Sequence, residues 1–293
     1  MRVRSWLFVP GDSEKKLEKS RGSNADVLIF DLEDSVGPSN KAKARDLVAA
    51  HLRAIPKSER TSQLWVRVNP LDSGLTEADL QSIIPAEPDG IVMPKPDGPQ
   101  DAAALSADIS AKENASGFDT GQVQMMVIAS ETAKSAFTLG DYSEANIERL
   151  SAMTWGAEDL SSALGASSKF DADGKLSFTY QMVRSLTLLG AHAAELSAID
   201  GVYTDFRDLD GLAESSRAAR AEGFHGRLAI HPAQVDVINA AFTPDQAEIE
   251  HAQQVVAAFE AEPGAGVVAF DGKMLDIPHL KQAQKLLAAA QAT

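Results

Sequence analysis

Short apolar runs alternate with amphipathic segments along most of the chain. Eight such runs are bounded by turn residues or charges, and helical spacing of apolar residues follows most of them. They span residues 4–9, 26–31, 64–68, 90–93, 124–129, 150–155, 198–203 and 227–230. Eight strands alternating with helices over about 250 residues are typical of a closed (β/α)₈ barrel. A doubly wound open sheet gives the same alternation, and we predict the TIM barrel, an α/β fold, for residues 1–232.

The remaining residues, 233–293, form a C-terminal extension to the predicted barrel. The pattern predicts a helix over residues 244–261, a break at the PGAG sequence of residues 263–266 and a hairpin over residues 267–276. A last helix follows Pro278. We therefore expect a barrel that carries a small, mainly helical extension.

Two apolar runs within residues 123–160 lead into carboxylates. VQMMVIAS leads to Glu131 and MTWGAE leads to Asp159, 28 positions later. If both runs are strands of one parallel barrel, both acids lie at the rim that holds the active sites of such barrels. Mg²⁺ retains several waters and needs few protein carboxylates, so these acids are candidate metal ligands. The alternative is that they only cap the helices that follow.

Other polar residues follow the predicted strands in the same way. They are Asp31, Glu33 and Asp34 after the second strand, Arg67 and Asn69 at the third, Lys95 at the fourth and His231 at the eighth. Arg67 offers a fixed fork for a carboxylate or an enolate oxygen. Structural alternatives are a buried pair of Asp31 with Arg67, a solvated helix-start role for Glu158 and a hydrogen-bonded, non-catalytic His231.

The composition narrows the classes of partner. The chain has 27 basic and 42 acidic residues, a formal net charge of −15, so its overall field repels nucleic acids and anionic membranes. It has no cysteine, which excludes disulfides, thiolate nucleophiles and iron-sulfur clusters. No apolar run reaches the ~18 residues of a membrane helix. The first run is expected to be a strand and not a signal peptide, and we expect a cytoplasmic protein.

Several motifs, taken in order, resemble one known family. They are RSWLFVPGD, DVLIFDLEDSV, WVRVN, IVMPK, IASETA, WGAEDL, GFHGRLAIHP and DGKMLDIPHLKQA. Together they resemble the citrate lyase β-subunit-like branch of the HpcH/HpaI aldolase superfamily, which includes malyl-CoA and citramalyl-CoA lyases. The resemblance covers residues 4–287. It implies a (β/α)₈ barrel, a Mg²⁺ cofactor with Mn²⁺ as a possible substitute, coenzyme A as part of the substrate, and a homotrimer or dimer of trimers.

The resemblance also implies roles for individual residues. Glu131 and Asp159 become the metal ligands, and Arg67 faces the substrate and the enolate. The backbone of Gly156, Ala157, Glu158 and Asp159 holds the keto-acid carboxylate, and Asp276 of the extension reaches a neighbouring subunit's site. One departure is Ser130, which replaces the family's apolar residue before the glutamate.

A coenzyme A substrate needs basic partners in an acidic protein. Lys15, Lys19 and Arg21, with Lys16 between them, are the nearest cluster in sequence to the first strand. A solvated helix face interleaved with Glu14 and Glu18 explains these residues equally well.

The resemblance implies a carbon-carbon lyase. The expected reaction cleaves or forms a 3-hydroxyacyl-CoA such as malyl-CoA or citramalyl-CoA, with acetyl-CoA and glyoxylate or pyruvate as the other partners. The alternatives are a malyl-CoA-type thioesterase on the same site and a citrate lyase β subunit that needs an acyl-carrier partner. The sequence does not choose the acyl-CoA or keto acid.

Overall fold

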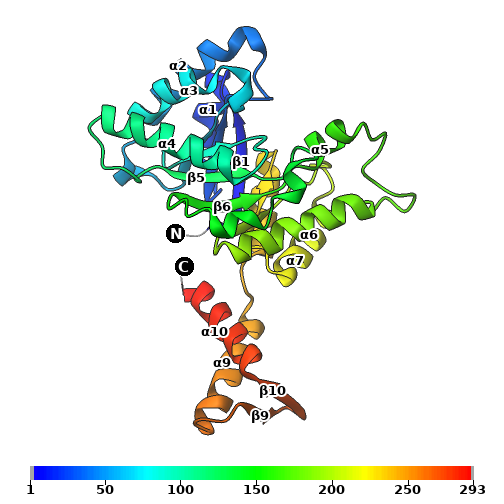
Figure 1. Cartoon of the computed structure of the whole chain (residues 1–293). Coiled ribbons are helices and arrows are strands. Elements are labelled where there is room, and N and C mark those ends of the chain that lie inside the picture. The colour runs from blue at the N-terminus through cyan, green and yellow to red at the C-terminus, as the bar shows by residue number, and fades with distance from the viewer. Residues whose placement is uncertain (1–2, 292–293) are drawn as a thin grey trace.

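Eight parallel strands close into a barrel in the computed structural model, which describes residues 3–291 (Figure 1). The strands are β1 Ser5–Pro10, β2 Val27–Asp31, β3 Gln63–Arg67, β4 Gly90–Met93, β5 Gln124–Ile128, β6 Leu150–Thr154, β7 Ser197–Asp200 and β8 Gly226–Ala229. Each strand pairs with the next, and β1 pairs with β8. This closure confirms the predicted TIM barrel over the open sheet.

The helices of the barrel are α1 Glu14–Ser20, α2 Lys41–Arg53, α3 Thr76–Ile83, α4 Pro99–Ala115, α5 Ala157–Leu164, α6 Phe178–Ala193, α7 Leu209–Glu222 and α8 Val235–Ala241. Between β5 and β6 the chain forms the 3₁₀ turns Ser135–Phe137 and Asp141–Glu144. Among residues 3–291, no helix is both long and apolar enough to cross a membrane.

The barrel has an inner and an outer apolar layer because side chains alternate along each strand. The inner layer contains Trp6 and Trp65, whose rings meet edge to face at 4.9 Å. Gly90 leaves room for this packing, since a Cβ there would lie 2.4 Å from the Trp65 ring. The outer layer lies between the strands and the helices. The inner layer fills the barrel with apolar side chains, so polar chemistry is confined to its ends.

The C-terminal extension has a core of its own. It consists of α9 Gln246–Ala261, the antiparallel hairpin of β9 Val267–Phe270 and β10 Lys273–Asp276, and α10 Ile277–Gln291. Val255, Phe259 and Val268 are buried together in it. Helix α8, in contrast, buries its apolar face in the outer layer of the barrel. The sequence placed the boundary after residue 232, and the change of core lies later, between α8 and α9, because α8 has an apolar face that only the barrel covers.

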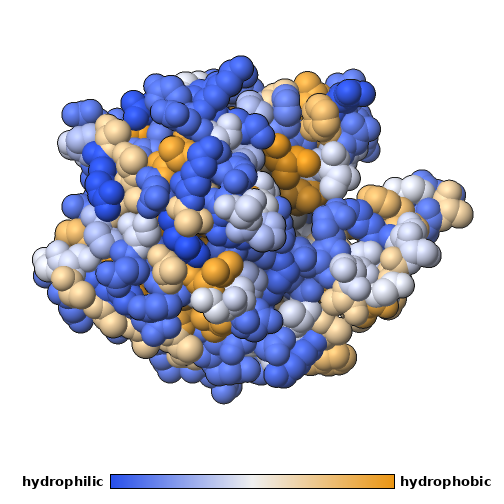
Figure 2. Space-filling view, turned by 90° about the horizontal axis from the view of Figure 1, so that it is seen from above, coloured by the Kyte–Doolittle hydropathy of each residue, from blue (hydrophilic) through white to orange (hydrophobic). Residues whose placement is uncertain are grey.

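The extension leaves the barrel at the end where the strands begin. At the amino end of β1, Arg4 Nη1 donates to Thr243 Oγ1 (2.9 Å) and Ser5 Oγ donates to Asn239 Oδ1 (2.7 Å). Figure 1 shows the extension projecting away from the barrel beyond this point. The surface seen from above is mostly hydrophilic, with hydrophobic residues in separate patches (Figure 2).

Candidate active site

The carboxyl ends of β2 and β3 bring an acid and a base together. Asp31 and Arg67 are register partners, and the guanidinium binds the carboxylate through two bonds of 2.8 Å. Burial alone would raise the pKa of Asp31, but the Arg67 charge and hydrogen bonds outweigh it and lower that pKa to about 2. The Arg67 guanidinium also lies over the Phe8 ring, 4.8 Å from its centroid. The pair fixes Arg67 in position at the rim.

A second group of charges surrounds Lys95, which follows β4. Its Nζ contacts Glu33 and lies 3.2 Å from Asp159 Oδ1 and 3.3 Å from Asp34 Oδ2. Glu33 Oε2 in turn lies 2.8 Å from Arg67 Nη1. Burial alone would lower the pKa of Lys95, but the Glu33 hydrogen bond and charge raise it, so Lys95 is a cation in this site.

The backbone of Lys95 has an unusual conformation. Its φ is +53°, in the left-handed region that few side chains adopt, and prolines 94 and 96 flank it. This turn directs the Lys95 N–H at Glu131, whose Oε2 accepts it at 2.7 Å. Lys95 therefore contacts both predicted metal ligands, Glu131 through its backbone and Asp159 through its side chain.

Glu131 lies buried at the end of β5. Burial, followed by the nearby Asp159 charge, raises its pKa to about 8. Gly156 lies against this side chain, since a Cβ there would be 2.7 Å from Glu131 Cγ and 3.0 Å from Oε1. A glycine at the start of the β6–α5 connection is therefore needed for Glu131 to occupy this place.

Helix α5 contains Asp159 in its first turn and begins next to Glu131. Ala157 is its first residue, and the N–H of Leu160 is the first in the helix to bond back, to the carbonyl of Gly156. The N–H groups of Ala157, Glu158 and Asp159 are thus without helical acceptors at a positive helix end. The Glu158 side chain instead pairs with Lys169 in the loop after α5. An anion at this turn would therefore be bound by the free backbone N–H groups, because the Glu158 carboxylate is turned toward Lys169.

The residues present fit a divalent cation. Five carboxylates (Asp31, Glu33, Asp34, Glu131 and Asp159) face the two cations Arg67 and Lys95, and Glu131 is buried without a full countercharge. Over the part of the chain that the structure describes, no cluster of three or more Asp, Glu, His or Cys side chains is arranged to hold a metal. A two-carboxylate site is the type that Mg²⁺ occupies together with water.

Other residues singled out in the sequence lie outside this group. Lys15 and Lys19 are exposed on α1, while Arg21 pairs with Glu18 at 3.2 Å. His231 caps the turn after β8 by accepting the Ala233 N–H, which agrees with a structural role.

Asp276 is half exposed at the start of α10 in the extension. The extension leaves the barrel at the amino ends of the strands, and Glu131 and Asp159 follow the carboxyl ends. The structure therefore does not bring Asp276 to the site of its own chain.

Sequence reasoning placed Lys95 and Glu33 at the rim without assigning them a role. The signal for Lys95 was a lysine between two prolines at a strand end, which fixes where the backbone turns. The Ser130 hydroxyl beside Glu131 and the Thr154 hydroxyl at the end of β6 are buried without a hydrogen-bond partner among the described residues. They add two free polar groups below the rim.

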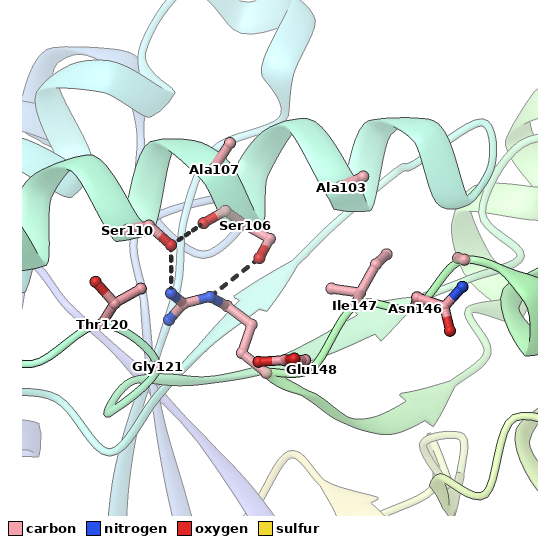
Figure 3. A pocket seen from close by; sticks show the side chains of 11 residues that line it. Ala103, Ser106, Ala107, Ser110, Thr120, Gly121, Asn146, Ile147 and Glu148 are labelled. Carbon is pink, nitrogen blue, oxygen red and sulfur yellow. Dashed lines mark hydrogen bonds between the residues drawn. The ribbon is translucent and has the colours of Figure 1, made fainter.

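A hollow of about 340 Å³ lies at the opposite end of the barrel, between α4 and the segment before β6 (Figure 3). Arg149 lines it, but Glu113 pairs with Arg149 at 2.8 Å, and Ser106 Oγ, Ser110 Oγ and the Val123 carbonyl accept its other hydrogen bonds. The charge and hydrogen bonds of Arg149 are thus taken up by neighbouring groups of the protein.

Comparisons with known proteins agree with this geometry. The chain is 37% identical to a (3S)-malyl-CoA thioesterase of Cereibacter sphaeroides over 99% of its length and 95% of that protein. It is 35% identical to the mitochondrial citramalyl-CoA lyase of Rattus norvegicus, over 98% of this chain and 86% of that protein. A crystal structure of CitE from Mycobacterium tuberculosis in complex with magnesium, acetoacetate and coenzyme A matches with a TM-score of 0.80 and 32% identity, covering 99% and 98% of the two chains.

The family model described as HpcH/HpaI aldolase/citrate lyase matches residues 4–232, the whole barrel up to the turn after β8. This match, the full-length relatives and the rim of acids and bases lead to one conclusion. The chain belongs to the HpcH/HpaI aldolase/citrate lyase family of carbon-carbon lyases.

Proposed function

We propose that the protein is a Mg²⁺-dependent lyase that cleaves or forms the carbon-carbon bond of a short 3-hydroxyacyl-CoA. Malyl-CoA or citramalyl-CoA would give acetyl-CoA and glyoxylate or pyruvate. The observation that carries the proposal is the convergence of Glu131, Asp159, Arg67 and Lys95 on one rim. Relatives named for malyl-CoA and citramalyl-CoA, and a related structure with magnesium and coenzyme A, support this substrate class.

Glu131 and Asp159 would hold the metal ion. When bound, Mg²⁺ (or Mn²⁺ in its place) would polarise the substrate's hydroxyl oxygen and neutralise its carboxylate. The backbone from Gly156 to Asp159, with N–H groups free of helical acceptors at residues 157–159, would hold that carboxylate. Arg67, at the same rim, would then face the bound substrate.

Arg67 would stabilise the enolate of acetyl-CoA. The enolate forms when the hydroxyl loses its proton and the carbon-carbon bond breaks, which places negative charge on the thioester oxygen. Arg67 is held by Asp31 through two bonds and has little freedom to move, so it needs little reorganisation to meet this charge. Glu33 also holds Arg67, since its Oε2 lies 2.8 Å from Arg67 Nη1. Lys41 in turn fixes the Glu33 backbone, because Lys41 Nζ donates to the Glu33 carbonyl at 2.7 Å.

Asp276 would protonate the enolate carbon from a neighbouring subunit. A homotrimer, or a dimer of trimers, would bring the extension of one chain to the rim of the next. The support is the exit of the extension from the end of the barrel opposite the rim, which leaves Asp276 of the same chain on the wrong side.

The phosphates of coenzyme A would lie near Lys15, Lys19 and Arg21. These residues are exposed and follow β1, whose carboxyl end borders the rim. The lysines carry the charge more freely than Arg21, which shares its own with Glu18.

The test is a product assay with purified protein, Mg²⁺ and either malyl-CoA or citramalyl-CoA. The lyase predicts acetyl-CoA and a keto acid, and excess EDTA should abolish both. The second candidate is a malyl-CoA thioesterase, favoured by the 37% identity to a protein of that name, and it would release free coenzyme A and malate. A protein active only after addition of an acyl-carrier partner would instead be a citrate lyase β subunit. No product from any of these thioesters would refute the proposal.

A further inference from the structure

Asp276 has a histidine partner at the start of α10. His279 Nδ1 lies 2.5 Å from Asp276 Oδ1, and the backbone N–H of Asp276 lies 3.2 Å from the same nitrogen. Both side chains are about half exposed. In the part of the chain that the structure describes, neither side chain forms another hydrogen bond or ion pair.

The short contact requires a proton between the two atoms. Nδ1 has either a proton or a lone pair, and a carboxylate oxygen without a proton only accepts. A protonated Nδ1 donates to the Asp276 carboxylate. An unprotonated Nδ1 accepts from a protonated Asp276 carboxyl, and it can also accept the backbone N–H. In both arrangements a single proton lies between His279 Nδ1 and Asp276 Oδ1. They differ only in which of the two atoms it is covalently bonded to.

We propose that His279 is a positioning residue that relays protons to Asp276. The inference rests on the proposed function, in which Asp276 protonates the enolate in a neighbouring site. The Asp276 O–H bond breaks as the new C–H bond forms on acetyl-CoA, leaving a carboxylate. The proton lost is the one that Asp276 shared with His279, so both Nδ1 and the carboxylate are left without it. The half-exposed imidazole then takes one proton from solvent at Nδ1, which restores the shared proton for the next turnover. One proton enters from solvent for each proton placed on carbon.

Exposure suits His279 to this task. A residue facing the enolate should be shielded from water during the reaction, while its proton source must exchange with water. Asp276 ends β10, and His279 lies three positions later in the first turn of α10. The imidazole can therefore remain in contact with water while the carboxylate enters a neighbour's site.

Charged or titratable groups also lie on the elements that pack around the pair. They are Lys273 on β10, Lys281 and Lys285 on α10, and Glu248, Glu250, His251 and Glu260 on α9. None of these pairs with Asp276 or His279.

A purely structural role would be a helix cap. Asp276 directly precedes α10 and His279 is its third residue, the position where a Glu or Gln side chain closes a capping box. A His279→Gln variant therefore keeps a capping side chain but cannot change protonation state. His279→Ala loses both properties, so the two variants separate capping from relay.

The experiment measures turnover of the full-length protein with malyl-CoA or citramalyl-CoA and Mg²⁺ from pH 5.5 to 9. His279→Ala and His279→Gln should both lose about 10² in kcat, the size of a general acid-base contribution. Melting temperatures should show that His279→Gln folds as the parent does. Added imidazole should restore part of the rate of His279→Ala, and the pH profile of both variants should differ from that of the parent.

Two results would overturn the inference in different ways. If His279→Gln turns over at the parental rate with the parental pH profile while Asp276→Ala is inactive, His279 is only a cap and the proposed function stands. If Asp276→Ala is itself fully active, the extension does not serve the site and the relay fails with it.

Discussion

The pH dependence of Mg²⁺ binding tests the proposed metal site most directly. Without a cation, burial and the Asp159 charge raise the pKa of Glu131 to about 8. A metal ion binds the carboxylate and not the carboxylic acid, so Mg²⁺ has to displace a proton from Glu131 at neutral pH. We expect the affinity for Mg²⁺ to rise with pH up to about 8 and then to level off.

The magnitude follows from that pKa. At pH 7, one unit below it, about one molecule in ten has an ionised Glu131, and at pH 6 about one in a hundred. The apparent Kd should therefore weaken about tenfold for each pH unit below 8, or about 1.4 kcal/mol. Binding at pH 7 should release close to one proton, about 0.9 per ion, and binding above pH 9 should release almost none.

Isothermal titration calorimetry in two buffers of different ionisation enthalpy measures both the apparent Kd for Mg²⁺ and the number of protons released on binding. Glu131→Gln is the matched control, because it keeps the size of the side chain and removes its titration; it should bind Mg²⁺ weakly and release no proton. Asp159→Asn should also bind weakly, and its remaining proton release should shift to lower pH, since a neighbouring negative charge has gone. A Kd for the parent that does not change between pH 6 and 8, with no proton release, would refute the reasoning.

Four further changes test other parts of the site. Arg67→Met should lower kcat by about 10² to 10³ through loss of enolate stabilisation, with Mg²⁺ binding retained in calorimetry. Gly156→Ala should displace Glu131, whose Cγ lies 2.7 Å from the added Cβ, and weaken Mg²⁺ binding in a protein whose circular dichroism is unchanged. Asp31→Asn should remove about 2 kcal/mol of stability at pH 7, an effect that disappears as pH falls from about 4 to 2, because the folded pKa of Asp31 is the lower one; urea unfolding at several pH values measures it. Asp276→Ala should abolish turnover and leave Mg²⁺ affinity unchanged in calorimetry, and equal kinetics would exclude the shared site.

Local pattern was sufficient for the elements of the barrel. Buried parallel strands are continuous apolar runs, so β4 was found at Gly90–Met93 without error and the other strands to within a few residues. Helix α8, which follows the predicted boundary at residue 232, packs on the barrel, but its apolar spacing would be the same if it packed on a later helix. That choice depends on which surface is nearby, and periodicity contains no such information.

The candidate site was predictable as a set of residue types at strand ends, because parallel strands place all their carboxyl ends on one rim. The contacts within it were not. The sequence left open an ion pair between Asp31 and Arg67, and the structure shows this pair. The pair holds the Arg67 guanidinium in place at the rim, which is compatible with a substrate-facing role for Arg67. Glu158 pairs with Lys169, while Asp159 lies beside Lys95 in the group of charges at the rim.

The sequence by itself determined the strand and helix pattern, the acidic character, the absence of cysteine chemistry and the acids at the strand ends, because these depend on local spacing and composition. Only the tertiary structure decided that Lys95 joins Glu131 to Asp159, that Gly156 makes room for Glu131, and that Asp276 lies far from its own rim. Each of these depends on distances between residues that are tens of positions apart, and such distances are fixed only when the barrel closes.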